Sequence, residues 1–334
     1  MSIFMKNSKG EWVKTNAETL LASRKNKWQG WTCGIGTLKL DIKPNGDVYN
    51  GVCEVGGCKG NVFEGTLELE NDWVTCTKPA CSCGDDMMVR KFRPPRKKED
   101  TYRLGTTEKD QIENENVVGP YYLDFHNTYD KTVTWRFSRR CNYYCQYCPS
   151  SVSNLYDEHR SWAELKRAVD TILDTFAREN KIKFIILGGE PTINPSYLKL
   201  VKYIHSKGHF LHTTTNGSRK SNYYGELIKY SAIGLSVHFE FAKNQHIIDV
   251  VREIKKSKDE KVELADKNWF GIRLMVRPGH LAEAKNLAYN IREEFNNIDD
   301  WCEITLSSLY SALDDNELIY FNEDELKEIE KNDA

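Results

Sequence analysis

The sequence lacks any stretch that could cross a membrane. No apolar run approaches the roughly 18 residues that a transmembrane helix needs. The first residues, from Met1 to Lys6, contain no apolar segment of the kind that a secretory signal peptide carries. We therefore expect a cytoplasmic protein without membrane contacts.

The sequence also lacks an excess of charge, internal repeats and low-complexity segments. With 47 basic and 49 acidic residues the formal net charge is −2, which disfavours nucleic acid as a partner. One basic run, residues 89–98, could contact a phosphate backbone, but a solvated linker balanced by nearby acids is the simpler interpretation. Local motifs must therefore indicate the function.

Cysteine, by contrast, is abundant and clustered. The 334 residues include ten cysteines: six between positions 33 and 83, three between 141 and 148, and Cys302 alone. In a reducing cytoplasm such cysteines are more often metal or cluster ligands than disulfide partners. The distribution predicts two metal-binding regions, and the length allows one large domain and a small one.

The central motif consists of Cys141, Cys145 and Cys148, spaced C-x3-C-x2-C. A short loop of this kind can present three thiolates to three irons of a 4Fe–4S cluster and leave the fourth iron open. A structural zinc site usually has four ligands, in two closely spaced pairs. The spacing therefore favours a cluster, with structural zinc and buried free thiols as the alternatives.

With the aromatic Tyr147 before the third cysteine, this run resembles the signature loop of the radical S-adenosylmethionine (SAM) enzymes. The resemblance implies that Cys141, Cys145 and Cys148 bind a 4Fe–4S cluster. It also implies that SAM binds the open iron through its amino and carboxylate groups, with Tyr147 among the cofactor-binding residues.

From about residue 118, apolar strands alternate with amphipathic helices, the first of which opens on a capping box from Ser161 to Glu164. Six such units predict an α/β fold, a partial (βα)6 TIM-type barrel of parallel strands, as the resemblance to radical SAM cores over 118–310 also implies. Chemistry in such barrels lies at the C-terminal strand ends. The expected strands are 132–137, 183–187, 209–215, 233–238, 270–276 and 302–307.

Two of these strand ends carry short polar motifs. Gly188, Gly189, Glu190 and Pro191 resemble the family's GGE motif, whose glycines let the backbone approach a ligand. The resemblance implies that this backbone and the Glu190 carboxylate receive the SAM ammonium. After the next strand, Thr215 and Asn216 precede a glycine and resemble the family's contact to ribose or carboxylate, although a plain Asn-Gly turn explains them equally well.

Later strands add weaker candidates. Ser236 resembles the family's serine near the ribose, and His238, on the same strand face, is either an acid–base group or a core histidine. Cys302 opens the sixth strand at its N-terminal end and is interpreted as a structural thiol rather than a hydrogen-atom donor. The remaining candidates are Met275 and Val276 against adenine and Arg277 beside a carboxylate of SAM or substrate.

The N-terminal cysteines accompany a hairpin predicted at 37–52, with its turn at Asn45 and Gly46. The block resembles the SPASM or twitch auxiliary cluster domains of radical SAM enzymes, but it precedes the core and its spacing from Gly46 to Cys53 is longer. An auxiliary cluster and a structural zinc site both remain open here. The ligand candidates are Cys33, Cys53, Cys76, Cys81 and Cys83, with Cys58 as a sixth.

Together these observations predict a cysteine-rich β-hairpin domain at 1–88, a linker at 89–117 and a radical SAM core at 118–334. The expected activity is reductive cleavage of SAM to a 5′-deoxyadenosyl radical that takes a hydrogen atom from a small molecule or peptide. Expected cofactors are the 4Fe–4S cluster, SAM and a second cluster or zinc, and the expected partner is a reductase or flavodoxin-type electron donor. The alternative is a non-catalytic zinc- or cluster-binding protein that binds nucleic acid or another partner.

Overall fold

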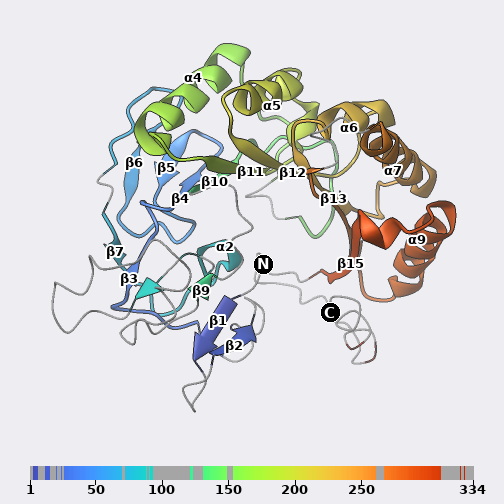
Figure 1. Ribbon diagram of the computed structural model, residues 1–334, viewed down its shortest axis with the longest axis horizontal. Helices are drawn as coiled ribbons and strands as arrows, with labels where there is room; N and C mark the ends of the chain where they lie inside the picture. The colour runs from blue at the N-terminus through green and yellow to red at the C-terminus, as the bar shows by residue number, and fades with distance from the viewer. Residues whose placement is uncertain are drawn as a thin grey trace. The chain divides into compact units, whose positions relative to one another are not determined.

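The structure is a computed structural model, shown in Figure 1, and it describes the chain in several separate stretches.

 The described residues are 3–6, 12–15, 20, 24, 26–69, 72–87, 89, 91–92, 121–122, 131–148, 153–260, 267–309, 324 and 327. The basic run 89–98 therefore lies largely outside the described residues. Among the described residues, no helix combines the length and the apolar character that a membrane crossing needs.

The chain divides into two compact units that interleave in sequence. The N-terminal unit comprises residues 1–134 and 167–183, and the barrel unit comprises residues 135–166 and 184–334. The division passes through strand β10 (Lys131–Arg136), helix α4 (Trp162–Ile172) and strand β11 (Ile182–Leu187). These units differ from the expected division at 1–88, 89–117 and 118–334, which stays a prediction.

The fold is α/β with a mostly parallel sheet, consistent with the expected partial TIM-type barrel. The largest sheet has the strand order β15-β14-β13-β12-β11-β10-β4-β5-β6. Its registers are parallel from β12 to β15, as in the pairs Leu235 with Ile272 and Ile272 with Ile304. The strands of the barrel unit are β12 (Phe210–Thr215), β13 (Ala232–Val237), β14 (Phe270–Val276) and β15 (Glu303–Ser308).

Helices follow these strands as the periodicity predicts, and Figure 1 shows α5, α6, α7 and α9 along one side of the barrel unit's strands. The capping box forms, because Ser161 and Glu164 exchange hydrogen bonds between their side chains and backbone amides at the start of α4. A short π-helical turn, Leu173–Ala177, follows α4. The other helices are η3 (Pro191–Ile193), α5 (Tyr197–Ser206), α6 (Ser221–Leu227), α7 (Asn244–Asp259), α9 (Leu281–Glu294) and η4 (Ile298–Asp300).

Alternation decides which strand face forms the core. In β13 every second residue is buried, and Leu235 lies near Ile247 of α7, since a Cβ on Gly217 would meet both side chains. The helices therefore cover the face that carries Leu235 and Val237. The intervening residues, Ser236 among them, belong to the opposite face of the sheet.

The predicted hairpin forms, but its strands belong to the large sheet. β4 (Lys39–Ile42) and β5 (Asp47–Tyr49) pair antiparallel around the tight turn at Gly46, whose φ of +96° favours glycine. In the N-terminal unit the Thr132 amide of β10 donates to the Leu38 carbonyl at 2.8 Å, and β6 (Cys58–Asn61) follows β5. The sequence pattern predicted the hairpin correctly and did not predict that it would continue the sheet.

Two small sheets complete the described strands. One has the order β7-β3-β8, from β7 (Val74–Thr75), β3 (Thr32–Cys33) and β8 (Lys91–Phe92). The short helix α2 (Gly84–Met87) precedes β8 in the chain. The other sheet has the order β2-β1-β9, from β2 (Trp12–Thr15), β1 (Ile3–Lys6) and β9 (Tyr121–Tyr122).

Candidate active site

The predicted site residues of the barrel unit follow the C-terminal ends of β10 to β14. The cysteine loop, residues 141–148, comes after β10, and the Gly-Gly-Glu segment comes directly after β11. Thr215 ends β12, His238 follows β13 and Arg277 follows β14. Because parallel strands end at the same edge of a sheet, these positions share one side of the barrel unit.

All three thiols of the cysteine loop are free, and each is at least partly buried. The Tyr143 amide and the Asn216 side-chain amide approach the Cys141 sulfur at 3.4 and 3.8 Å, and the Cys148 amide donates to the Cys145 carbonyl at 2.9 Å. Burial raises the pKa of all three thiols, that of Cys145 to about 11, and the neighbouring thiols contribute to the rise at Cys141 and Cys145. The loop therefore gathers thiols that become thiolates when a cation binds them.

The donor set fits an iron–sulfur cluster. N–H groups directed at a sulfur stabilise thiolate ligands, and a cluster uses one thiolate for each iron that the protein binds. Among the residues that the structure describes, no group of three or more His, Cys, Asp or Glu side chains converges on one point to hold a single metal ion. The preference for a cluster over zinc therefore rests on the spacing and the chemistry of the loop.

Gly188 and Gly189 let two backbone segments touch. A Cβ on Gly189 would lie 2.2 Å from the Arg140 carbonyl oxygen, and one on Gly188 would lie 2.6 Å from the Ser138 carbonyl oxygen. The Gly189 amide donates to the Ser138 carbonyl oxygen at 2.6 Å, and the Glu190 amide donates to the Arg140 carbonyl oxygen at 2.8 Å. The close approach is thus to the segment that leads into the cysteine loop, whereas the sequence motif suggested an approach to a ligand.

The Glu190 carboxylate joins the ends of β11 and β12. Its Oε1 accepts from the Thr192 amide at 3.0 Å, from the Thr192 hydroxyl at 2.5 Å and from the Thr215 hydroxyl at 2.8 Å. Its Oε2 accepts from the Asn216 amide at 2.6 Å. Burial raises the pKa of Glu190, and these hydrogen bonds oppose the rise. The carboxylate is already occupied by neighbouring donors, and its predicted contact to an ammonium group stays a prediction. Pro191 follows at the first position of η3.

Asn216 connects β12 to the cysteine loop. Its side-chain amide donates to the side-chain oxygen Oδ1 of Asn142 at 3.1 Å, besides its contact with the Cys141 sulfur. The Ser218 hydroxyl reaches the same Asn142 oxygen at 3.2 Å. The sequence motif indicated Asn216 as a cofactor contact and missed Asn142 altogether, although its position beside Cys141 is a signal that could have found it.

His238 is a neutral partner of Tyr147. The Tyr147 hydroxyl lies 2.7 Å from His238 Nδ1, and the two rings stack with their centroids 5.8 Å apart. Tyr147 also hydrogen-bonds the Cys145 thiol. Desolvation lowers the pKa of His238 to about 4. The histidine thus orients the aromatic residue of the loop, and near neutral pH it has no proton to give as a general acid.

This burial predicts a pH dependence of stability. Above pH 6.5 the imidazole is neutral in the folded and unfolded chain, so it contributes nothing. As the pH falls from 6.5 towards 4, the histidine is protonated in the unfolded chain but stays neutral in the folded one. The free energy of unfolding therefore decreases, and below pH 4 the decrease reaches about 3 kcal/mol. In urea unfolding between pH 4 and 7, His238→Phe should lose less stability than the wild type as the pH falls.

The exposed His280 supplies the matched control for this measurement, because its side chain is 45 % exposed. His280→Phe should follow the wild type across the same pH range. Parallel curves for wild type and His238→Phe would contradict the buried, neutral state of His238.

The remaining predicted residues fall on two strand faces. Ser236 pairs in register with Arg273, which places Met275, two residues on, on the same face as Ser236 and His238. Val276 is fully buried and belongs to the opposite face. Of the two residues predicted to pack on adenine, only Met275 therefore shares a face with Ser236. Both contacts with adenine stay predictions.

The thiols of the N-terminal unit include a group around Asp86. Cys33 and Asp86 raise the pKa of Cys53 and of Cys81, both to about 12, on top of the larger effect of burial. Burial raises the pKa of Cys33 and Cys83 in the same way, with contributions from Cys76 and Asp86 at Cys33. The Asp86 carboxylate accepts from the Cys53 amide at 2.7 Å and from Lys39 at 2.8 Å.

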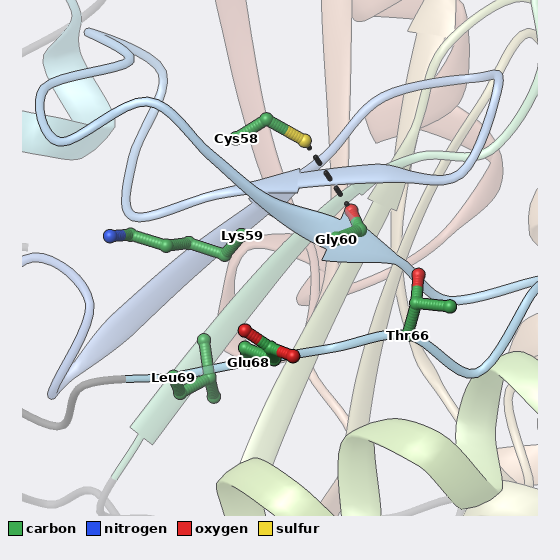
Figure 2. A pocket seen from close by; sticks show the side chains of 6 residues that line it. All are labelled: Cys58, Lys59, Gly60, Thr66, Glu68 and Leu69. Atoms are coloured by element: carbon green, nitrogen blue, oxygen red, sulfur yellow. Dashed lines mark hydrogen bonds between the residues drawn. The ribbon is translucent and has the colours of Figure 1, made fainter.

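Cys58 differs from these thiols. It is exposed, its sulfur points to the Gly60 carbonyl oxygen at 3.5 Å, and it lines an open pocket of about 400 Å³ in the N-terminal unit. Figure 2 shows it with the other lining residues: Lys59, Gly60, Thr66, Glu68 and Leu69. The lone Cys302 is 2 % exposed and precedes β15, as expected for a structural thiol at the N-terminal end of a strand.

Comparisons with known proteins bear on the barrel unit. Residues 135–268 match a protein-family model described as the Radical SAM superfamily. Over 98 residues the chain is 28% identical to the Fe-coproporphyrin III synthase of Methanosarcina barkeri (strain Fusaro / DSM 804). That match covers 29% of this chain and 24% of the relative, so the chain spans about a quarter of the length of this curated protein.

Similar solved structures include Streptococcus suis SuiB bound to S-adenosylmethionine, with a TM-score of 0.42 and 16% identity over 60% of this chain and 45% of that one. Native anSMEcpe with bound AdoMet gives a TM-score of 0.37 and 18% identity over 57% of this chain and 55% of that one. The same protein was also solved with AdoMet and a peptide bound, at 17% identity, a TM-score of 0.37 and coverage of 57% and 53%. The chain thus matches about half the length of these proteins.

Proposed function

We propose that the protein is a radical SAM enzyme that cleaves SAM reductively and uses the resulting radical on a substrate C–H bond. The match of residues 135–268 to the Radical SAM superfamily model supports this proposal. The observation that carries the proposal is the cysteine loop, whose Cys141 sulfur accepts from Asn216 at the end of β12. The loop is also bonded through its entry segment to Gly189 after β11. The cysteine loop and two neighbouring strand ends therefore meet at one place.

Cys141, Cys145 and Cys148 would hold the 4Fe–4S cluster. When bound, the cluster supplies one electron to SAM, whose sulfonium C–S bond breaks to give methionine and a 5′-deoxyadenosyl radical, which takes a hydrogen atom from the substrate. The chain's residues provide the surroundings. Asn216 and the Tyr143 amide direct N–H groups at the Cys141 sulfur and so stabilise its thiolate form.

Other residues fix the shape of the site. Glu190 bonds the ends of β11 and β12 together, and this keeps Asn216 in place beside the loop. His238 and Tyr147 fill the space next to Cys145 with two stacked rings, which exclude water from that side of the thiol. Ser236 and Met275 are proposed to contact SAM from the strand face that continues to His238. Arg277, whose Nη1 already donates to Glu240, is proposed to pair with a carboxylate of SAM or substrate through its other N–H groups.

Anaerobic incubation with SAM and dithionite tests the proposal. Iron-loaded protein should release methionine and 5′-deoxyadenosine, which liquid chromatography with mass spectrometry detects together. Protein that carries a full cluster and forms neither product would overturn the assignment. A reductase or flavodoxin-type protein is the proposed natural electron donor, and a small molecule or a peptide is the proposed substrate.

A second metal centre is proposed for the N-terminal unit. Cys33 contributes to the raised pKa of both Cys53 and Cys81, and Cys76 contributes to that of Cys33. Asp86 contributes to the raised pKa of Cys83, and these influences support the proposal that the thiols belong to one site. An auxiliary cluster is preferred to zinc because of the resemblance to SPASM and twitch domains. Metal analysis of anaerobically purified protein decides between them: iron beyond one four-iron cluster supports the auxiliary cluster, and zinc with a single cluster contradicts it.

A further inference from the structure

The turn between β13 and α7, residues 238–243, lies directly against the cysteine loop. Its own backbone is closed by bonds from the Phe241 and Ala242 amides to the His238 carbonyl oxygen, at 3.0 and 2.9 Å. Phe241 stacks on Tyr143 of the loop with ring centroids 5.1 Å apart. The turn therefore packs against the loop through two aromatic contacts, Phe241 with Tyr143 and His238 with Tyr147.

Between these two contacts, Glu240 bonds the loop backbone itself. Its Oε2 accepts from the Gln146 amide at 3.0 Å, and its Oε1 accepts from Arg277 Nη1 at 3.1 Å. The Glu240 side chain is only 10 % exposed. Its two carboxylate oxygens thus join the loop to the residue that follows β14, across sequence distances of 94 and 37 residues.

The negative charge of Glu240 indicates why this residue bonds the loop backbone. The carboxylate lies beside a loop that carries three prospective metal ligands, and a largely buried negative charge without a partner carries an electrostatic cost. Arg277 offsets that cost by pairing with the carboxylate, and the remaining oxygen is left to accept from the Gln146 amide. A charged acceptor makes a stronger bond to a backbone amide than a neutral one does. The arrangement is therefore suited to holding the loop backbone in one conformation.

We propose that Glu240 is a positioning residue that fixes the cysteine loop through the Gln146 amide before the metal binds. The inference rests on the proposed function for the identity of the metal, but the effect on the loop is a property of the chain alone. Neither Glu240 nor Gln146 belongs to the cysteine pattern, and sequence reasoning missed both. The position of Glu240, two residues after His238 at a strand end, is the signal that could have found it.

Amide hydrogen exchange in the full-length, metal-free protein tests the proposal directly. Glu240→Ala should speed exchange at the Gln146 amide about tenfold or more, because the amide loses a charged acceptor. Glu240→Gln keeps one acceptor oxygen and should give an intermediate rate, which also serves if the alanine variant does not fold. Glu226→Ala is the matched control: its carboxylate pairs with Lys202 and Lys229 at the surface, and the variant should exchange like the wild type.

A second measurement connects the loop to the metal. Iron-loaded Glu240→Ala should lose iron to a chelator several-fold faster than the wild type or Glu226→Ala. Its unfolding midpoint, followed by far-ultraviolet circular dichroism, should be the same as that of the wild type. Unchanged Gln146 exchange in Glu240→Ala overturns the proposal, whatever the iron measurement gives. If the wild type binds iron but does not cleave SAM, while exchange at Gln146 still responds, the proposed function fails and the positioning role of Glu240 stands.

Discussion

Replacing Cys145 by alanine is expected to reduce SAM cleavage by more than about 100-fold and to lower the iron content of the barrel unit. Replacing a residue that only hydrogen-bonds a metal ligand already costs roughly 10- to 100-fold in metal affinity or activity. Removing a ligand itself should therefore cost at least as much. Cys145 is the most buried thiol of the loop, and its hydrogen bond from Tyr147 shows that its sulfur is enclosed by the loop's own side chains.

The measurement compares iron content, visible absorption and formation of 5′-deoxyadenosine in anaerobically purified variants. Cys58→Ala is the matched control, because the same atom is removed from an exposed position in β6. The control should cleave SAM at the wild-type rate. Wild-type cleavage by Cys145→Ala would show that the loop is not the site of the chemistry.

Gly189→Ala is expected to destabilise the fold by about 3 kcal/mol or more and to abolish SAM cleavage as well. The added Cβ would lie 2.2 Å from the Arg140 carbonyl oxygen and 2.6 Å from that of Arg139. Both obstacles are backbone atoms, so no change of rotamer relieves the clash. The backbone bonds to Ser138 and Arg140 would break, and these residues lead directly into Cys141.

Gly208→Ala separates backbone strain from this clash. Gly208 has a φ of +81°, and nothing lies within 4 Å of the position that its Cβ would take. Its replacement should cost only about 1–2 kcal/mol of left-handed strain and leave SAM cleavage intact. Urea unfolding and SAM cleavage are measured on both variants, and equal effects at the two positions would refute the explanation by backbone contact.

The strands and helices of the barrel unit could be predicted because their signals are local. The apolar run that ends at Leu187, the capping box at Ser161 and the alternation that continues to His238 each specify an element from neighbouring residues. The structure confirms the expected α/β fold on this basis. The predicted strand ends differ from the observed ones by at most one residue, as at β15, which begins at Glu303 rather than Cys302.

The partners of the site residues could not be predicted in the same way. Nothing near Glu190 in the sequence indicates that Thr215 and Asn216, 25 and 26 residues later, will use its carboxylate oxygens. The same holds for Glu240 and the hairpin, since their partners lie in other elements. Sequence spacing indicates which residue types are available, and tertiary contacts decide which of them remain open to a ligand.

The ties on the cysteine loop imply an order of maturation. They come from Gly189 after β11, Asn216 after β12 and Glu240 after β13, and Glu240 itself is paired with Arg277 after β14. A nascent chain that has emerged only as far as Cys148 has none of these anchors, and contacts between distant residues form late because long loops must close first. Insertion of the proposed cluster is therefore expected at the end of biogenesis, after the strands downstream of the cysteines have been synthesised and paired.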